Sequence, residues 1–290
     1  MNLDFTAITL DRQGEYLALL RETPQLSSDY SLVNVWAWAE EYGLEWAWEG
    51  GLVWIRQSRP TPAYWAPVGP WQAIDWQTMM PRLEGDHFIR LPENLALLMV
   101  HGHPRAGIRS SRDHWDYLYS LPELVALAGN RFHAKQNLLR QFQASYLWRY
   151  QPLDPGLIEQ VLMMQSQWCA WRNCESSANL AAEDRAIAKV LGAFPAFASL
   201  LGGVLLVEGR VVAFTVAEPL PPDTLVIHFE KGMGSYKGVY QSMNREFLAA
   251  QPPGFTLVNR EQDLGDQGLR QSKISYHPVG FLRKYELLWR

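Results

Sequence analysis

Residues 224–285 constrain the fold of this chain most strongly, because strand and helix patterns alternate along them. The apolar run from Leu225 to Phe229 has the length of a buried strand. From Gly238 to Ala250, apolar side chains recur at the spacing of one helical stripe, and Pro252 ends that helix. A second strand is expected over residues 255–258, a short helix over 265–275 and a third strand over 281–288. This order predicts an α/β fold with helices layered on a mixed central sheet.

The remaining residues add helices and hairpins on both sides of a proline-containing linker. Ser28 or Asp29 is expected to start a helix that Gly43 ends, and Gly50 and Gly51 mark the turn of a hairpin. Further helices are expected over residues 120–129, 132–143, 157–171 and 178–191, and a second hairpin over 202–218. The second half therefore has the element order found in GNAT-type acyltransferases, and the first half repeats part of it.

The length of 290 residues favours two domains, since domains cluster near about 100–150 residues. The sequence QPLDPG, residues 151–156, is the predicted linker, with Asp154 as the N-cap of the helix that follows. We therefore expect one GNAT-like domain over residues 1–150 and a second over residues 151–290, arranged in tandem.

Composition limits the classes of partner and cofactor. A net charge of −4 argues against a globally basic nucleic-acid binder, although it leaves a local basic groove open. No apolar run reaches the roughly 18 residues of a membrane helix, so no integral membrane segment and a cytoplasmic location are expected. Cys169 and Cys174 are expected to be reduced thiols. Neither these cysteines nor His101 and His103 have further partners at metal-ligand spacing, so no metal is predicted.

Five stretches of the sequence resemble the phosphatidylglycerol lysyltransferase C-terminal domain family. These are SSDYSLVNVWAWAEEYG, YLYSLPELVALAGNRFHAKQNLLRQF, GGVLLVEGRVVAFTVAE, KGVYQSMNREF and NREQDLGDQGLRQSKISYHPVGFLRKY. The last is the most specific, because NREQDLG, GLRQSK and YHPVGFLRKY occur together at fixed spacing. The resemblance implies two GNAT-like domains related to the Fem-type peptidyltransferases. Membrane-embedded relatives move an aminoacyl group from tRNA to a lipid.

The turn before the helix at residue 239 is the predicted donor-binding loop. In GNAT-like sites such a turn presents backbone N–H groups to the pyrophosphate of coenzyme A. Tyr240 stands where a small residue is usual, so an aminoacyl-tRNA is an equally plausible donor. A plain strand-to-helix connection is the alternative interpretation. The predicted donor-binding residues are Gly234, Ser235, Tyr236, Lys237, Gly238 and Asn259.

Three residues are candidates for proton transfer. Glu230 ends the central strand, where a carboxylate can take a proton from an attacking amine, and His228 is expected on the same strand face. Tyr276 is the candidate acid for the leaving group. The alternatives are a polar strand end, a hydrogen-bonded core histidine and a packed tyrosine.

Candidate substrate-binding residues occur in both halves. In the second half, the candidates at the carboxyl edge of the sheet and in the segment after it are Arg260, Glu261, Asp263, Lys273 and His277. The alternative for Arg260 is an internal salt bridge with Glu261 or Asp263. In the first half they are Asp29, Tyr30, Asn34 and Trp38, expected to face an aromatic cleft between the halves, with N-capping and core packing as the alternatives. Lys135, Gln136, Asn137 and Arg140 form a basic and amide cluster that could meet phosphate or be a solvated helix face.

These residues predict an acyl- or aminoacyltransferase with an amine or hydroxyl acceptor. Acyl-coenzyme A or aminoacyl-tRNA is the expected donor substrate, and no tightly bound cofactor is expected. The expected partners are a small-molecule or peptide acceptor and, with the second donor, tRNA. The alternative is a non-catalytic protein that binds a peptide or small metabolite in the aromatic cleft.

Overall fold

The computed structural model describes residues 3–290 and divides the chain into two compact units that share its C-terminal part. Unit 1 contains the chain up to Tyr117 together with Glu261–Gln271 and Gly280–Arg290, and unit 2 contains Leu118–Arg260 and Ser272–Val279. The boundary predicted after residue 150 lies inside a strand, Trp148–Pro152. The units thus do not follow a single cut of the chain, and two GNAT-like domains divided at that residue remain a prediction.

Unit 1 contains two small antiparallel sheets with short helices. One sheet has the strand order β1-β2-β3-β4 and the other β5-β14-β6. The strands are β1 (Thr6–Ala7), β2 (Glu45–Glu49), β3 (Leu52–Gln57), β4 (Ala63–Tyr64), β5 (Leu91–Pro92), β6 (Ala106–Ser110) and β14 (Lys284–Trp289). The helices are α1 (Gln13–Glu22), α2 (Leu32–Ala37), α3 (Ala39–Tyr42), α4 (Trp76–Met79) and α5 (Glu93–Gly102), with a 3₁₀ turn, η2, at Ser28–Tyr30.

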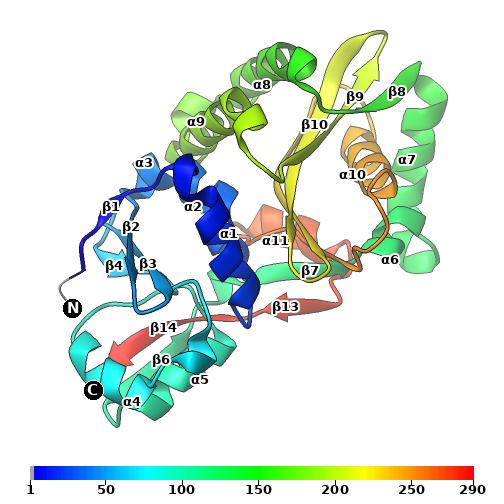
Figure 1. Ribbon diagram of the computed structural model, residues 1–290. Helices are drawn as coiled ribbons and strands as arrows, with labels where there is room; N and C mark the ends of the chain where they lie inside the picture. The colour runs from blue at the N-terminus through cyan, green and yellow to red at the C-terminus, as the bar shows by residue number, and fades with distance from the viewer. Residues whose placement is uncertain (1–2) are drawn as a thin grey trace. The chain divides into compact units, whose positions relative to one another are not determined.

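Unit 2 contains a mixed sheet with helices on both faces. Its strands are hydrogen-bonded in the order β7-β12-β11-β10-β9-β8, and only β11 and β12 run parallel to each other. Helices α7 and α10 lie on one side of β9 and β10, and α8 and α9 on the other (Figure 1). The strands are β7 (Asp116–Ser120), which begins in unit 1, β8 (Trp148–Pro152), β9 (Leu201–Val207), β10 (Arg210–Leu220), β11 (Thr224–Gly232) and β12 (Leu257–Asn259). The helices are α6 (Leu121–Ala126), α7 (His133–Ser145), α8 (Ile158–Arg172), α9 (Ala178–Gly192) and α10 (Val239–Ala249). Helix α11 (Gln267–Ile274) begins in unit 1 and ends in unit 2. Strand β13 (Gly280–Leu282) belongs to unit 1.

The mixed α/β class predicted from the sequence is confirmed. Both predicted hairpins form, and Gly43 ends α3 in the left-handed conformation. The first predicted helix is divided, because Ser27 caps the 3₁₀ turn and Ser31 then caps α2. The last predicted strand is also divided, into β13 and β14 on either side of Arg283.

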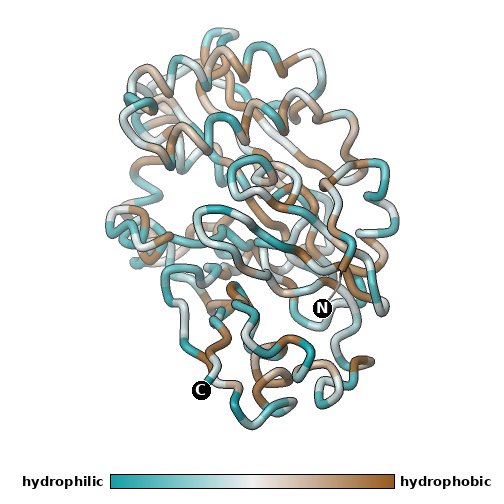
Figure 2. The backbone as a smooth tube through the Cα atoms, turned by 90° about the vertical axis from the view of Figure 1, so that its left-hand side faces the viewer, coloured by the Kyte–Doolittle hydropathy of each residue, from teal (hydrophilic) through white to brown (hydrophobic). Residues whose placement is uncertain are grey.

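Hydrophobic residues are distributed in short stretches, which form the strands and the inner helix faces. Figure 2 shows these stretches interrupted by hydrophilic ones along the whole tube. Within residues 3–290, no helix has both the length and the apolar character needed to cross a membrane.

The parallel pair β11–β12 is short, and this creates the principal irregularity of the unit 2 sheet. Pairing begins at Thr224 with Leu257 and its last pair joins Val226 to Asn259. β11 continues to Gly232, whereas β12 stops at Asn259. The second half of β11 therefore extends beyond its parallel neighbour, and Glu230 lies in that extension.

Gly238 allows α10 to begin close against α7. Its φ of +84° is left-handed, and a Cβ atom there would lie 2.1 Å from the carbonyl oxygen of Leu138. Gly209 has a similar φ of +80°, but a Cβ atom there would have nothing within 4 Å.

This contrast makes a prediction about stability. Gly209→Ala should cost about 1 kcal/mol of unfolding free energy from backbone strain. Gly238→Ala should cost about 1–3 kcal/mol more, because the added methyl group also forces α7 and α10 apart. Urea-induced unfolding measures both, and equal losses would show that the close approach of the two helices contributes nothing.

The expectation of two reduced cysteines was wrong. Cys169 and Cys174 form a disulfide with their Cα atoms 5.0 Å apart. The helix that carries Cys169 ends at Arg172, and Asn173 takes a left-handed conformation with φ 53°. This turn brings Cys174 back beside the last helical turn, which a continuous helix would not do.

Candidate functional site

The candidate site in unit 2 is centred on Glu230, where β11 extends past β12. The Glu230 side chain is 8% exposed. Its Oε1 accepts a hydrogen bond from Arg260 Nη2 at 2.9 Å, and its Oε2 accepts one from Asn244 Nδ2 at 3.0 Å. Arg260 directly follows the last residue of β12, so its side chain links the two strands where their backbones no longer pair. The salt bridge of Arg260 thus includes Glu230, whereas the alternative left open by the sequence was a salt bridge with Glu261 or Asp263.

Tyr276 lies beside the Arg260–Glu230 pair. Its hydroxyl accepts a hydrogen bond from Gln241 Nε2 at 3.2 Å, and the Arg260 guanidinium lies 4.9 Å from the ring centre. Burial raises the pKa of Tyr276, and the Glu230 charge acts in the same direction, although Arg260 opposes it. The phenol is therefore protonated at neutral pH, and only a strongly basic oxygen, such as a leaving alkoxide, would take its proton.

Two lysines complete this cluster. Lys135 Nζ, on α7, lies 4.2 Å from the centre of the Tyr276 ring. Lys273 Nζ donates to the backbone carbonyl of Arg260, and the Lys273 carbonyl accepts a hydrogen bond from Tyr119 Oη at 2.9 Å. The cluster therefore contains four predicted site residues, Glu230, Arg260, Tyr276 and Lys273, together with Lys135.

No sequence pattern indicated a role for Asn244, Gln241 or Tyr119. Asn244 is 1% exposed and directly follows Met243 of the apolar stripe of α10. A polar side chain beside the core stripe of a helix usually needs a buried partner, and this signal could have identified it.

His228 points away from Glu230, contrary to the expectation that they share a strand face. Thr215 is the cross-strand partner of Glu230, and the β10–β11 register shifts between Val216 and Ala217. His228 Nε2 lies 3.0 Å from Glu218 Oε1, with both side chains buried. Thr215 and Glu218 are three residues apart on one strand and so face opposite ways. The β-bulge thus moves His228 to the face of Glu218, and its catalytic assignment gains no support from this position.

The predicted donor loop makes several hydrogen bonds within unit 2. The N–H of Tyr236 donates to the Met233 carbonyl, that of Lys237 to Tyr146 Oη, and that of Val239 to the Tyr236 carbonyl. Gly234 packs under the ring of Trp171, Ser235 is exposed, and Asn259 is buried at the end of β12. The binding of a donor by these residues stays a prediction.

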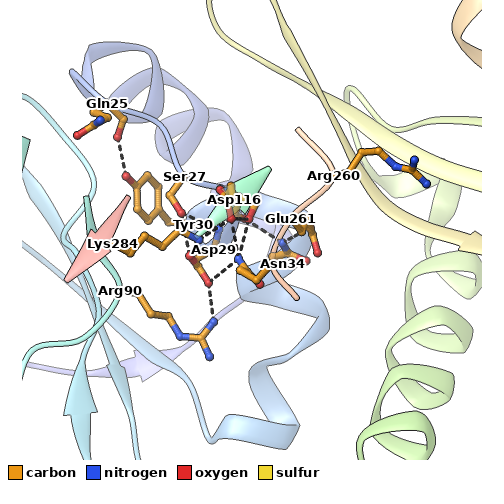
Figure 3. A network of polar contacts seen from close by, with 12 residues as sticks. Gln25, Ser27, Asp29, Tyr30, Asn34, Arg90, Asp116, Arg260, Glu261 and Lys284 are labelled. Atoms are coloured by element: carbon orange, nitrogen blue, oxygen red, sulfur yellow. Dashed lines mark hydrogen bonds and ion pairs between the residues drawn. The ribbon is translucent and has the colours of Figure 1, made fainter. Parts of the chain in front are cut away.

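A buried charge network occupies unit 1 (Figure 3). Asp29 forms ion pairs with Arg90 and with Lys284, and Lys284 also donates to Asp116 Oδ1 at 2.6 Å. The side chains of Lys284 and Asp116 are 0% exposed. Burial alone would raise the pKa of Asp29, but the charges of Lys284 and Arg90 hold it well below its usual range. Two buried cations thus balance two buried carboxylates.

Serine, asparagine and glutamine side chains extend this network. Ser28 Oγ donates to Asp116 Oδ1 at 2.9 Å, and Gln262 Nε2 donates to the same oxygen at 2.9 Å. Asn34 Nδ2 donates to Glu261 Oε1 at 2.7 Å, which joins two predicted substrate-binding residues. The other amide atom, Asn34 Oδ1, is buried without a hydrogen-bond partner among the described residues.

The remaining predicted substrate-binding residues lie in separate surroundings. Tyr30 is buried and its hydroxyl donates to the Gln25 carbonyl, while Trp38 is half-buried and packs against Tyr42. Asp263 accepts two hydrogen bonds from Arg270, at 2.7 and 2.9 Å. His277 Nε2 lies 3.0 Å from the Arg131 carbonyl oxygen. Their roles in substrate binding stay predictions.

The Asp29 environment predicts a pH dependence of stability. An unfolded aspartate has a pKa of about 3.9. Because the folded pKa is lower, the contribution of Asp29 is complete above that value and is lost as the pH falls through the folded pKa. The unfolding free energy of the wild type should therefore decrease below about pH 4, and Asp29→Asn should make the decrease shallower. Identical slopes in urea unfolding from pH 7 to 3 would contradict this account.

Comparison with known proteins gives a family and a set of similar folds. The family described as "Phosphatidylglycerol lysyltransferase, C-terminal" matches residues 20–287. A conserved protein of unknown function from Bacteroides thetaiotaomicron is 29% identical, with a TM-score of 0.90 over 99% of this chain and 100% of that one. L-PGS from Bacillus licheniformis is 12% identical, with a TM-score of 0.64 over 96% and 91% of the two chains. FemX is 8% identical, with a TM-score of 0.59 over 98% and 97%. No curated protein matches the chain.

Proposed function

Because this chain belongs to the phosphatidylglycerol lysyltransferase C-terminal family, we propose that it is an aminoacyltransferase whose reaction centre is Glu230. The observation that carries the proposal is the Arg260–Glu230 pair, at the point where β11 extends past β12. Ligands of open α/β sheets commonly bind at the carboxyl ends of neighbouring parallel strands. A carboxylate held there by an arginine and an amide can meet both a donor and an acceptor.

In the proposed reaction, Glu230 acts as the general base. The acceptor hydroxyl or amine attacks the carbonyl carbon of the aminoacyl ester and gives its proton to Glu230. The ester C–O bond then breaks, and the alkoxide oxygen that leaves the donor takes a proton from Tyr276 and becomes a hydroxyl. The proton that Glu230 accepted returns to the Tyr276 phenolate and restores both groups. Arg260 holds Glu230 in place and remains positively charged, because the charge of Glu230 raises its pKa although burial opposes this. No covalent enzyme intermediate is required.

An aminoacyl-tRNA is the proposed donor in preference to acyl-coenzyme A. The N–H groups of Tyr236, Lys237 and Val239 already have partners within unit 2. A pyrophosphate would have to displace these bonds to use the loop as a cradle. An aminoacyl ester has no pyrophosphate and does not need these backbone N–H groups. With aminoacyl-tRNA as the donor, the proposed reaction takes place in the cytoplasm.

Binding experiments with both donor classes test this choice. Aminoacyl-tRNA should raise the melting temperature of the purified protein, because a ligand that binds the folded state stabilises it. Acetyl-coenzyme A should leave it unchanged, and uncharged tRNA is the control for the aminoacyl group. A shift with the thioester alone would reverse the donor assignment.

A non-catalytic binding role is the second candidate. Both carboxylate oxygens of Glu230 already accept hydrogen bonds inside unit 2, as a purely structural residue would. Under this alternative, a peptide or small metabolite would bind and no aminoacyl donor would be consumed with any acceptor.

A further inference from the structure

A disulfide crosslinks the last turn of α8 to the chain that follows this helix. Cys169 and Cys174 are five positions apart, and α8 ends between them at Arg172. Asn173 then takes a left-handed backbone, and its N–H donates to the Ala170 carbonyl over 3.4 Å, which is long for a hydrogen bond. The covalent crosslink is therefore a main restraint on this turn.

Two tryptophans near Cys169 join this turn to the chain that leads into α10. Trp168 Nε1 donates to Tyr240 Oη at 3.1 Å. The Trp171 ring covers Gly234 so closely that a Cβ atom on this glycine would lie 2.8 Å from it. Trp171 is 60% exposed, so its position is set by the turn that carries it rather than by a surrounding core.

The start of α10 leads directly to the candidate site. Gln241, next to Tyr240, donates to the Tyr276 hydroxyl at 3.2 Å, and Asn244 donates to Glu230 at 3.0 Å. These residues and the crosslinked turn all belong to unit 2. A movement of the turn therefore reaches the proposed base and the proposed acid through a single helix.

We propose that Cys169 and Cys174 form a reversible thiol switch, whose oxidised form fixes the start of α10 and whose reduced form loosens it. Cys169 is half-buried and so within reach of a reductant, whereas Cys174 is only 5% exposed. The cytoplasm keeps most thiols reduced, and disulfides that form there are usually transient and redox-sensing. The compartment and the effect on transfer rest on the proposed function, but the structural change does not.

Reduction by glutathione is a two-electron exchange between thiols and disulfides. A glutathione thiolate attacks Cys169 Sγ, the S–S bond breaks, and Cys174 leaves as a thiolate that takes a proton. A second glutathione thiolate attacks the glutathione sulfur bonded to Cys169, and the Cys169 thiolate that leaves also takes a proton. Gln165 Nε2, 3.7 Å from Cys169 Sγ, can donate to this thiolate. The products are two cysteine thiols and one glutathione disulfide, and the reverse steps restore the crosslink.

Hydrogen exchange in the native full chain tests the switch without turnover. The wild type is equilibrated with millimolar reduced glutathione or with glutathione disulfide, and alkylation followed by mass measurement counts its thiols. In reduced glutathione both cysteines should be alkylated, and the amides of residues 233–240 should exchange about 10-fold faster than in the oxidised protein. The amides of β9 should keep their rates. The variant with Cys169→Ala and Cys174→Ala should exchange fast at residues 233–240 in both buffers.

The outcomes separate this inference from the proposed function. A crosslink that stays intact in reduced glutathione, or residues 233–240 that exchange equally fast in both states, would overturn the switch even in a protein that transfers aminoacyl groups. Redox-dependent exchange in a protein that transfers nothing would support the switch and reject the transferase. In a protein that does transfer, reduction should slow the transfer about 3- to 10-fold, and reoxidation should restore it. Equal transfer rates in both states would overturn the link from the switch to the site.

Discussion

Lys284→Met is expected to lower the free energy of unfolding by about 3–5 kcal/mol, the range for breaking a buried ion pair by removing one partner. Lys284 is fully buried and donates to both Asp29 and Asp116. Methionine fills a similar volume but leaves two neighbouring carboxylates without their shared cation. Urea-induced unfolding measures the loss, and Lys237→Met, at an exposed lysine, is the matched control.

A combined variant separates lost charge from lost packing. Lys284→Met together with Asp116→Asn removes the carboxylate that is left unpaired and keeps Asp29 paired with Arg90, so this variant should recover part of the stability. If Lys284→Met costs less than about 1 kcal/mol, or if the combined variant recovers nothing, the network does not stabilise unit 1 through charge pairing.

Glu230→Gln is expected to reduce the rate of aminoacyl transfer by about 10²- to 10⁴-fold, the range for losing a general base. Glutamine has nearly the same shape and keeps an oxygen that can accept a hydrogen bond from Arg260. It cannot take a proton from the acceptor. The loss should therefore appear in the maximal rate more than in the concentration of donor needed for half-saturation.

A matched control accompanies the Glu230→Gln measurement. Glu159→Gln changes the same functional group at an exposed position on α8 and should transfer at the wild-type rate. A Glu230→Gln protein that transfers as fast as the wild type would remove Glu230 from the chemistry.

Local sequence patterns predicted the elements, because the forces that form them act over a few residues. The stripe of α10, the hairpin of β9 and β10 and the end of a helix at Gly43 follow from spacing and residue type. Glu230, Arg260 and Tyr276 were also predicted as site residues, and the structure brings them together.

Contacts between residues far apart in the chain could not be predicted from the sequence. Lys284 and Asp29 are 255 positions apart, and no spacing rule connects them. The bulge at His228 could not be predicted from the sequence either. One extra residue in a strand changes the sheet face to which the following side chains point, but it does not change the composition of the strand. The disulfide depended on a left-handed Asn173 that the helical pattern did not indicate.

Single-turnover transfer from aminoacyl-tRNA tests the central claim most directly. The protein is mixed with tRNA that carries a radiolabelled aminoacyl group, and with phosphatidylglycerol or a small amine as the acceptor. The account predicts that label leaves the tRNA and appears in the acceptor with wild type but not with Glu230→Gln. Label that stays on the tRNA with every acceptor, or that moves equally fast with both proteins, would contradict it.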